Sequence, residues 1–554
     1  MLTSHSNKNG NLKRTAGPIG LMFASTTTMI GSGWLFGAFH VAKLAGPWSI
    51  LSWVIGAAIM MLIALCFAEL ATMFPRSGAL VHMSHASHGP GLGRLWGWLL
   101  FLAYVPIPTV EAEAIVTYAN SYLPIFLQPQ SDGLLTNVGL VSAMVLLGIF
   151  ALLNLMSIRW LLNLNTTITW LKILVPLITA SALLTSVLHV ENLSAAPDSY
   201  ALTGIFTALP TAGVVFSFFG FRTAIDLAGE STNPNRYIPF SVIGSIVLAT
   251  VIYITLQVAF LLAIAPEAIA NGWNQLNFVN SGGPFAMLAM SLGLTWLAGI
   301  IYTDAYISPA GTGLLMTTGG TRVLMANGEL RVGPAWLTHI NRFGVPWVAV
   351  IVMWIFGCIF LLPFPAWQQI VSYISAITVL TYGLGPVALI CLRRNAPAAE
   401  RPFRLRGAIV IAPAAFIAAN WVIYWTGYET NQFLYSLLTG GFIVYALYYH
   451  FIAKQPAHEF GWFHIAWLLP WFGGMWILSG LGTLGGIGVL SFGWALVTIA
   501  VWSLIVMLIA VATSLTPSIT KQVINNILAP SAYNEDSAAA GSFAEPASTN
   551  RAES

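Results

Sequence analysis

The sequence predicts an all-α integral membrane protein of about fourteen membrane-spanning helices, and three observations lead to this fold class. First, 57% of the 554 residues are hydrophobic and only 7% are charged. A mean hydropathy of +0.79 excludes a soluble globular protein of this length. Second, the apolar residues form stretches of the roughly 20 residues that a spanning helix needs. Third, glycine interrupts two of these stretches at corresponding places.

The apolar stretches define the predicted helices in chain order. They are 18–44, 48–74, 95–122, 136–156, 163–188, 204–229, 239–265, 284–318, 345–363, 368–392, 408–426, 432–452, 462–483 and 487–514. The first and the eighth are longer than a bilayer requires, so we expect them to be tilted or bent.

The basic residues support this helix count and predict an orientation. When successive loops are assigned to alternate sides of the membrane, the 21 Lys and Arg residues fall on one side, apart from Lys43 in an opposite loop and Lys172 inside a span. Basic loops face the cytoplasm. An even number of helices then places both termini of this multi-pass protein there.

The predicted organisation has four parts. Residues 1–16 are a cytoplasmic N-terminal segment, 17–395 a transport core of ten helices, 396–515 four additional helices, and 516–554 a cytoplasmic, disordered tail. Each half of the core has five helices and begins with an interrupted one. Because five is odd, the halves insert with opposite orientation, as in a five-plus-five inverted repeat. The last four helices lack buried ionisable residues and are expected to pack against lipid or another copy; no oligomeric state is predicted.

The two glycine interruptions, in helices 1 and 6, are the most informative local features. One is Ile30-Gly31-Ser32-Gly33-Trp34 and the other is Phe216-Ser217-Phe218-Phe219-Gly220-Phe221. A break within the bilayer leaves backbone groups without partners, so it persists only where it lines a polar cavity. A matched pair of breaks, one in each half, points to a transporter's substrate site.

Several motifs together resemble the amino acid–polyamine–organocation (APC) transporter superfamily. The matching segments are Ile30–Trp34, Phe67–Gly78, Gly229–Glu230, Asn233–Arg236 with Ile238-Pro239, and more weakly Thr321–Leu324. Asp304-Ala305 with Ser308-Pro309, and helices beyond twelve, resemble bacterial aspartate–proton symporters of this superfamily. The resemblance implies an inverted-repeat fold that binds substrate at the membrane midplane. Arg222 departs from it, because some relatives carry an acidic residue there.

The first break is expected to bind the α-carboxylate of a substrate. Its predicted residues are Met29, Ser32, Gly33 and Trp34. The N–H groups that open the second half-helix point inward with the positive end of its dipole, and the Ser32 hydroxyl assists. The alternative is a patch of small residues that packs helices together.

The second break is expected to bind the amino group through the carbonyls of Phe216, Ser217 and Phe219, at the negative end of a half-helix. The resemblance implies that Phe216 is an aromatic lid over the substrate; without it, Phe216 is a core residue. Arg222 follows the break and offers a bidentate partner for the side chain of aspartate or glutamate. Its alternative role, an ion pair with Asp226 four residues along the helix, stays equally open.

Three buried ionisable residues are the candidates for proton coupling. Lys172 lies about 12 Å into helix five, where an ammonium must be paired or face a cavity; proton-coupled relatives have a similar arrangement at this position. Asp304 in helix eight is the predicted partner of Lys172, or else a carboxyl satisfied by nearby hydroxyls. Glu111 and Glu113 point about 200° apart around helix three, so only one faces the cavity, and the resemblance favours Glu111. Glu69 is expected to form a structural ion pair.

The sequence therefore predicts a proton-coupled amino acid symporter for uptake, with acidic substrates favoured. The alternatives are an exchanger, a symporter for small neutral amino acids, and, in a different class, a passive channel. No catalytic triad or nucleotide-binding loop is present, so we expect neither an enzyme nor an ATP-driven pump. His82, His85 and His88 have no further ligands to complete a metal site. The expected partners are amino acid, protons and membrane lipids, with no cofactor and no nucleic acid.

Overall fold

The computed structural model describes residues 17–75, 79–129, 131, 133–156, 158–194, 201–228, 231–276, 283–329, 333–364, 366–447, 450–451 and 460–528. Within these ranges the regular elements are helical, with two isolated β-bridges, Leu127–Leu135 and Ile340–Pro346. The predicted all-α fold class is confirmed. The predicted N-terminal segment 1–16, the tail beyond 528 and two pieces of the recognised motifs, 76–78 and 229–230, lie outside the described residues.

The helices follow the predicted apolar stretches. They are α1 (Pro18–Met29), α2 (Ser32–Ala45), η1 (Gly46–Trp48), α3 (Ser49–Met73), α4 (Ala79–His88), α5 (Pro90–Tyr104), α6 (Pro106–Ala119), α7 (Asn137–Asn154), α8 (Ile158–Leu184), α9 (Glu191–Ser194), α10 (Ala201–Thr211), η2 (Phe216–Phe221), α11 (Arg222–Asp226), α12 (Pro234–Ala263), η4 (Pro266–Ile269), η5 (Trp273–Gln275), α13 (Pro284–Ser291), α14 (Thr295–Glu329), η7 (Ala335–Thr338), α15 (Trp347–Leu361), α16 (Trp367–Asn395), α17 (Ala408–Trp425), α18 (Tyr428–Leu447), α19 (Trp462–Ile465), α20 (Leu468–Leu481), α21 (Phe492–Thr513) and α22 (Pro517–Leu528). Each predicted span coincides with one or more of them.

Fewer helices meet the length and composition of a membrane span than the predicted fourteen. Among the described residues there are seven, or eight if the bent pair formed by α10 and the η2–α11 segment is one span. Some predicted spans fall on helices that are too short to pass alone, such as α15 with 15 residues and α20 with 14. The count of about fourteen therefore stays a prediction.

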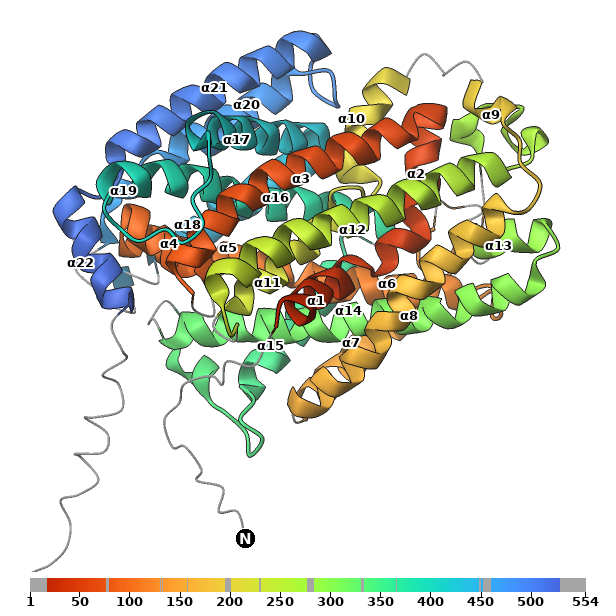
Figure 1. The fold of residues 1–554 in the computed structure, drawn as a ribbon, viewed down its shortest axis with the longest axis horizontal. Coiled ribbons are helices and arrows are strands. Elements are labelled where there is room, and N and C mark those ends of the chain that lie inside the picture. Colours follow the sequence, from red (N-terminus) through yellow and green to blue (C-terminus); the bar gives the residue numbers. More distant parts are fainter. Residues whose placement is uncertain are drawn as a thin grey trace, which may run out of the picture.

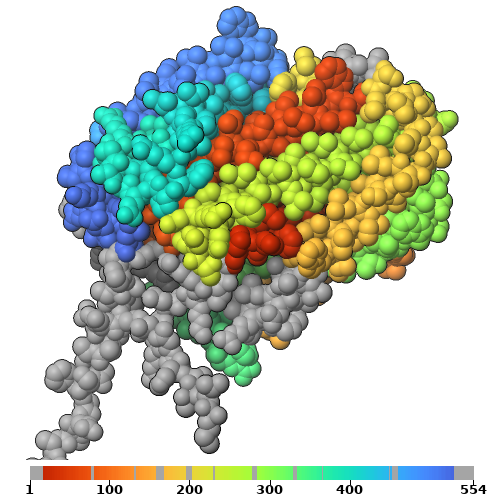
Figure 2. Space-filling view, in the orientation of Figure 1, coloured from red at the N-terminus to blue at the C-terminus, as the bar shows by residue number. Residues whose placement is uncertain are grey.

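The N-terminal and C-terminal helices form adjoining parts of one bundle (Figure 1). The long helices α3 and α12 pack side by side, and α12 also packs on α8, as the exposed face in Figure 2 shows. The additional helices gather on one flank, where α17 contacts α3, α16 and α21. The two breaks lie inside the bundle, since residues 29–33 and 212–222 are buried, while α17 to α21 border it.

The first break occurs where the glycines predict it. Helix α1 ends at Met29, Ile30 and Gly31 are non-helical, and α2 begins at Ser32. Gly31 has φ −119° and ψ −138°, a backbone conformation that ends the α-helical hydrogen-bond ladder. The missing Cβ matters too, because one at Gly31 would meet the carboxyl of Glu111 and the hydroxyl of Thr312.

The second break lies earlier than predicted. The chain leaves α10 after Thr211 and resumes as the 3₁₀ segment η2 at Phe216, with a bend of 46° between the two parts. Gly213 makes the turn possible, since its φ of +87° is a conformation that other residues rarely adopt. The predicted breaking residue, Gly220, lies within η2 instead and has a packing role described below.

The C-terminal tail also differs from its prediction. Residues 516–554 were expected to be disordered, yet 517–528 form the helix α22, which packs on α16 and α4. Its side chains Thr520 and Ile524 are buried. Spaced four residues apart, they form one face that is held by these neighbours.

A buried ion pair fastens the end of α16, as predicted for Glu69. The fully buried Glu69 carboxylate accepts bonds from Arg393 Nε at 3.0 Å and Nη2 at 2.5 Å, and Arg401 Nε lies 3.2 Å from it. The backbone N–H of Leu405 donates to it as well, at 2.8 Å. One carboxylate thus joins the last turn of α3 to α16 and to the segment that follows α16.

Glu69→Ala is expected to lower the thermal stability of the purified protein. Removing one member of a buried pair leaves the guanidinium groups of Arg393 and Arg401 without their partner, at a typical cost of about 3–5 kcal/mol. The apparent melting temperature in detergent measures this loss. Glu267→Ala removes an exposed carboxylate and is the matched control; equal melting temperatures for the two variants would contradict the role of Glu69.

Candidate functional site

The two breaks lie directly against each other. A Cβ at Gly33, in the first turn of α2, would overlap the Ser217 hydroxyl of η2. On the other side of this contact, a Cβ at Gly220 would lie 2.5 Å from the Met29 backbone nitrogen and 2.7 Å from the Ser25 carbonyl oxygen. Glycine at both places therefore allows the interrupted parts of helices 1 and 6 to approach with backbone contact.

Side chains satisfy backbone groups that the breaks set free. The Ser25 hydroxyl donates to the Phe221 carbonyl at 3.3 Å and accepts from the Ala224 N–H at 3.0 Å. The Tyr253 hydroxyl donates to the Met29 carbonyl at the end of α1, at 2.9 Å. Polar groups within a membrane-spanning bundle need such partners, and these tie helix 1 to helix 6 and to α12.

The N-terminus of α2 carries an acidic side chain in this structure. The Ser32 N–H donates to Glu111 Oε2 at 2.8 Å, which is the position where the sequence predicts a substrate carboxylate. The Ser32 hydroxyl accepts from Trp367 Nε1 at 3.0 Å. One of the predicted donors, the Ser32 N–H, therefore binds a carboxylate in this structure, and α6 supplies it.

Trp367, the first residue of α16, is a central site residue that the sequence analysis missed. Its ring stacks on His40 with centroids 5.3 Å apart and packs against Phe36 at 5.1 Å. A Cβ at Gly213 would lie 2.8 Å from this ring, so the indole fills the space beside the second break. A tryptophan at the start of an apolar stretch is common at membrane interfaces, and nothing local marks this one as different.

The second break supplies aromatic rings and carbonyls that already have partners. Phe216 is 7% exposed and lies edge-on to Phe219 and to Trp367, with centroids 6.3 Å apart in both cases. The Ser217 hydroxyl donates to the Gly213 carbonyl at 2.8 Å. The Phe219 carbonyl accepts from the Tyr382 hydroxyl at 3.1 Å. Phe216 therefore lies beside both breaks, since a Cβ at Gly33 would also lie 3.6 Å from its ring; its role as a lid stays a prediction.

Lys172 joins α8 to the end of α1 and to α14. Its fully buried Nζ donates to the Thr27 carbonyl at 3.1 Å and to the Thr312 hydroxyl at 2.7 Å. Both acceptors are neutral. The ammonium thus lies where a carbonyl of the broken helix and a hydroxyl of α14 converge.

Asp304 has other partners than the predicted one. Its Oδ2 accepts from Trp34 Nε1 at 3.1 Å and its Oδ1 from the Ser308 hydroxyl at 2.9 Å. The direct pair with Lys172 is not formed in the described residues, because Asp304 lies two helical turns from Thr312, the residue of α14 that Lys172 contacts. The alternative prediction was that nearby hydroxyls satisfy the Asp304 carboxyl. Of those hydroxyls, the one of Ser308 does so.

Of the two glutamates of α6, Glu111 contacts the first break and Glu113 does not. Both are fully buried. Neither carboxyl oxygen of Glu113 has a hydrogen-bond partner among the described residues, although the carboxyl lies near the backbone N–H of Trp367. The two side chains leave the helix in different directions, as their spacing requires.

Arg222 forms the ion pair that its alternative role predicts and keeps one nitrogen free. Its Nε lies 3.5 Å from Asp226 Oδ2, to which the Tyr104 hydroxyl also donates at 2.8 Å. The guanidinium lies 4.0 Å from the Tyr104 ring centroid and 5.8 Å from that of Tyr382. Its buried Nη1 has no hydrogen-bond partner in the described part of the chain, so it can donate to a further carboxylate.

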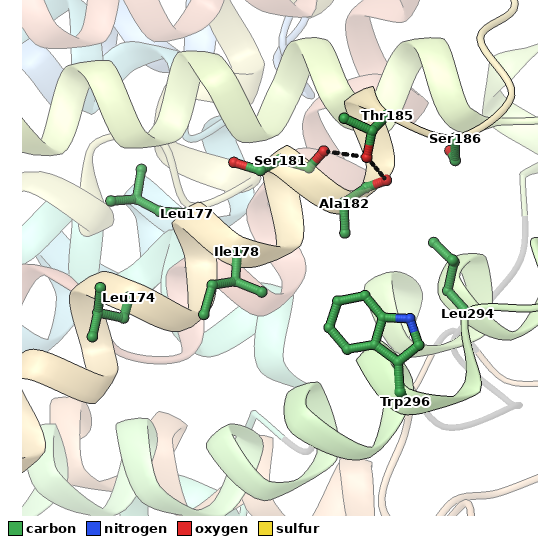
Figure 3. Close-up of a pocket in the computed structure, with 9 residues that line it drawn as sticks. All are labelled: Leu174, Leu177, Ile178, Ser181, Ala182, Thr185, Ser186, Leu294 and Trp296. Atoms are coloured by element: carbon green, nitrogen blue, oxygen red, sulfur yellow. Dashed lines mark hydrogen bonds between the residues drawn. The ribbon is translucent and has the colours of Figure 1, made fainter.

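A separate groove of about 460 Å³ lies between α8 and α14, away from the breaks (Figure 3). Its lining is largely apolar, with Leu174, Ile178 and Trp296 among the side chains. The Thr185 hydroxyl in this groove donates back to carbonyls of its own helix, at 3.0 and 3.1 Å. The groove holds none of the predicted site residues.

Several known proteins are similar to this chain. The family model described as amino acid permease matches residues 17–436. The glutamate/serine transporter AimA of Bacillus subtilis is 39% identical over 508 residues, covering 89% of this chain and 93% of the relative. The aspartate-proton symporter of the same organism is 33% identical over 506 residues, covering 90% and 96%. The branched-chain amino acid permease BcaP is 28% identical over 458 residues, covering 79% and 93%.

Proposed function

This chain is a member of the amino acid permease family and a multi-pass membrane transporter of amino acids, and from that premise we propose that it is a proton-coupled symporter for acidic amino acids. We further propose a bacterial inner membrane location with both termini in the cytoplasm, which rests on the distribution of Lys and Arg between the loops. On this orientation α14 begins at the outer side and ends at the cytoplasmic side.

The observation that carries the proposal is the carboxylate on the Ser32 N–H. In the structure that carboxylate belongs to Glu111, and the positive end of the α2 dipole favours it. A substrate α-carboxylate binds the same N–H group by taking the place of Glu111. The displaced Glu111 side chain is then free to pick up a proton, which links substrate binding to protonation.

The amino group is proposed to bind at the second break. Because the break begins after Thr211, the negative end of that half-helix lies at the carbonyls of residues 208–211, close to Gly213. Ser217 and the aromatic faces of Phe216 and Phe219 border this place and are proposed to enclose the substrate. Met29, Gly33 and Trp34 line it from the side of helix 1.

The acidic preference is proposed to come from Arg222. Its unpartnered Nη1 offers a charge-assisted bond to a side-chain carboxylate, while Asp226 and Tyr104 hold the rest of the guanidinium in place. The names of the two relatives, which specify glutamate or serine and aspartate, favour the same class. A small neutral substrate would leave this nitrogen unused.

Proton coupling is proposed to act through Lys172. As an ammonium, it binds the Thr27 carbonyl of α1 and the Thr312 hydroxyl of α14 and so joins the broken helix to the surrounding bundle. Losing the proton removes the charge that strengthens both bonds. Release of α1 from α14 then allows the conformational change that opens the site to the other side.

An uptake panel in proteoliposomes tests the proposal. Labelled aspartate, glutamate, serine and leucine are presented with and without an inward proton gradient. We expect accumulation of the two acidic amino acids above equilibrium, abolished by a protonophore, and loss of the acidic preference in Arg222→Ala.

Each alternative predicts a different result in this panel. Uptake that needs internal substrate but no proton gradient indicates an exchanger, and uptake that never exceeds equilibrium indicates a passive channel. A preference for serine or leucine that Arg222→Ala does not change would contradict the role of Arg222.

A further inference from the structure

We propose that one face of α14, formed by Asp304, Ser308 and Thr312, carries protons from the outer side to Lys172, with Asp304 as their first acceptor. This rests on the proposed function and adds to it the route of the coupling ion. The three side chains lie at positions i, i+4 and i+8 and therefore form one stripe along the helix. All three are buried, with exposures of 2%, 0% and 2%.

Both ends of this stripe are already joined by hydrogen bonds. The Ser308 hydroxyl donates to Asp304 Oδ1 at 2.9 Å, and Lys172 Nζ donates to the Thr312 hydroxyl at 2.7 Å. One helical turn, about 5–6 Å, separates Ser308 from Thr312, a gap that a single water bridges. Pro309 lies in this turn and has no N–H to donate to the Ala305 carbonyl, which leaves a polar group there for that water.

The environment of Asp304 suits a group that gains and loses a proton. Its two partners, Trp34 and Ser308, are neutral donors, and a charged carboxylate without a cation is costly within a membrane. The titratable groups that act on it are Tyr118 on α6 and Lys172 on α8. Glu111 on α6 lies near Lys172, Tyr302 on α14 packs on Tyr118, and α2 contributes the neutral Trp34. Taking up a proton at Asp304 therefore removes a charge that its surroundings compensate weakly.

Asp304 also lies on the outer side of Lys172. It precedes Thr312 by eight residues, about 12 Å along α14, toward the end proposed to face outward. Tyr122 is 63% exposed, its ring lies 5.1 Å from that of Tyr302, and Tyr302 lies 6.1 Å from the buried Tyr118. The Tyr118 hydroxyl has no hydrogen-bond partner in the described residues. These phenols connect the surface to the neighbourhood of Asp304.

Proton transfer along this route makes and breaks only O–H and N–H bonds. A proton from outside water binds the Asp304 carboxylate, then passes to Ser308 and, through the bridging water, to Thr312, each oxygen releasing one proton as it accepts another. The last acceptor is the neutral amine of Lys172, which becomes an ammonium. Trp34 Nε1 of α2 donates to Asp304. Each protonation of Asp304 therefore weakens this bond to α2, which couples protonation to the substrate site.

The test uses full-length variants in proteoliposomes and the labelled amino acid that the wild type accumulates. Two rates are measured, namely accumulation driven by an inward proton gradient and counterflow exchange without a gradient. Asp304→Asn, which mimics the protonated carboxyl, is expected to lose accumulation by about tenfold or more and to keep counterflow. Ser308→Ala is expected to slow accumulation severalfold, and Ser308→Thr, which keeps the hydroxyl, to restore it.

Thr303→Ala is the matched control, because Thr303 is an exposed neighbour whose hydroxyl donates to the Gly299 carbonyl of its own helix at 2.8 Å. Accumulation at the wild-type rate in both Asp304→Asn and Ser308→Ala would overturn the route. So would a parallel loss of counterflow in Asp304→Asn and Ser308→Ala, since that marks a structural role. If the wild type itself ignores the proton gradient, the proposed function fails instead.

Discussion

Lys172→Ala is expected to abolish uphill uptake while leaving exchange of substrate across the membrane. In the wild type, the buried ammonium holds the Thr27 carbonyl and the Thr312 hydroxyl together. Alanine removes both bonds and the group that carries the charge, so the movement of α1 against α14 no longer depends on a proton. A carrier without this dependence can only equilibrate its substrate.

The measurement is the ratio of internal to external labelled substrate under an inward proton gradient. We expect this ratio to fall to unity in Lys172→Ala, with counterflow retained. Lys521→Ala removes an exposed lysine of α22 and is expected to keep the wild-type ratio. Accumulation above equilibrium in Lys172→Ala would refute the coupling role of this residue.

Gly220→Ala is expected to reduce transport by about a hundredfold, because a misplacement of about 1 Å at a binding site has effects of this size. The added Cβ would lie 2.5 Å from the Met29 nitrogen and 2.7 Å from the Ser25 carbonyl oxygen. These are backbone atoms and cannot rotate away. Helix α1 must therefore move from η2, which separates the two breaks that are proposed to hold the substrate.

Gly20→Ala is the matched control for this variant, since it adds a methyl group to α1, the helix that the Gly220 Cβ would displace, at a place where nothing lies within 4 Å of the new Cβ. Initial uptake rates of both variants, compared at equal amounts of monodisperse protein, give the result. A Gly220→Ala rate near that of Gly20→Ala would show that the close contact between helices 1 and 6 does not matter for transport.

Local composition was enough to locate the first break but not the second. Two glycines around Ser32 stop α1 within a residue of the predicted position. In helix 6, the prediction placed the break at Gly220, within a run of aromatic residues. In the structure the break lies at Gly213, shortly after Pro210. A glycine serves either a positive φ or a close approach, and only the neighbouring helix decides which. Here Trp367 packs beside Gly213, which has the positive φ, and the α1 backbone packs beside Gly220, which allows the close approach.

Burial of charge was predictable, whereas the partners were not. A lysine or carboxyl inside an apolar stretch must be satisfied, and this argument identified Lys172 and Asp304. Glu111 was preferred to the other glutamate of α6 through the family resemblance, and Arg222 was identified because it follows the second break. The same reasoning suggested Lys172 and Asp304 as partners; the two groups interact electrostatically but form no direct ion pair among the described residues, because the sequence does not tell how far along α14 the two helices cross. It also left two options for Arg222, of which the ion pair with Asp226 is present.

The sequence by itself determined the all-α membrane class, the apolar stretches, the first break and the family. These follow from the composition and periodicity of adjacent residues, which water and lipid act on directly. The tertiary structure alone decided that Glu111 lies on the Ser32 N–H and that Trp367 lies on the Ser32 hydroxyl, contacts that join residues 79 and 335 positions apart. Hydrogen bonds over such separations depend on how helices pack, and a single sequence carries no local signal for that.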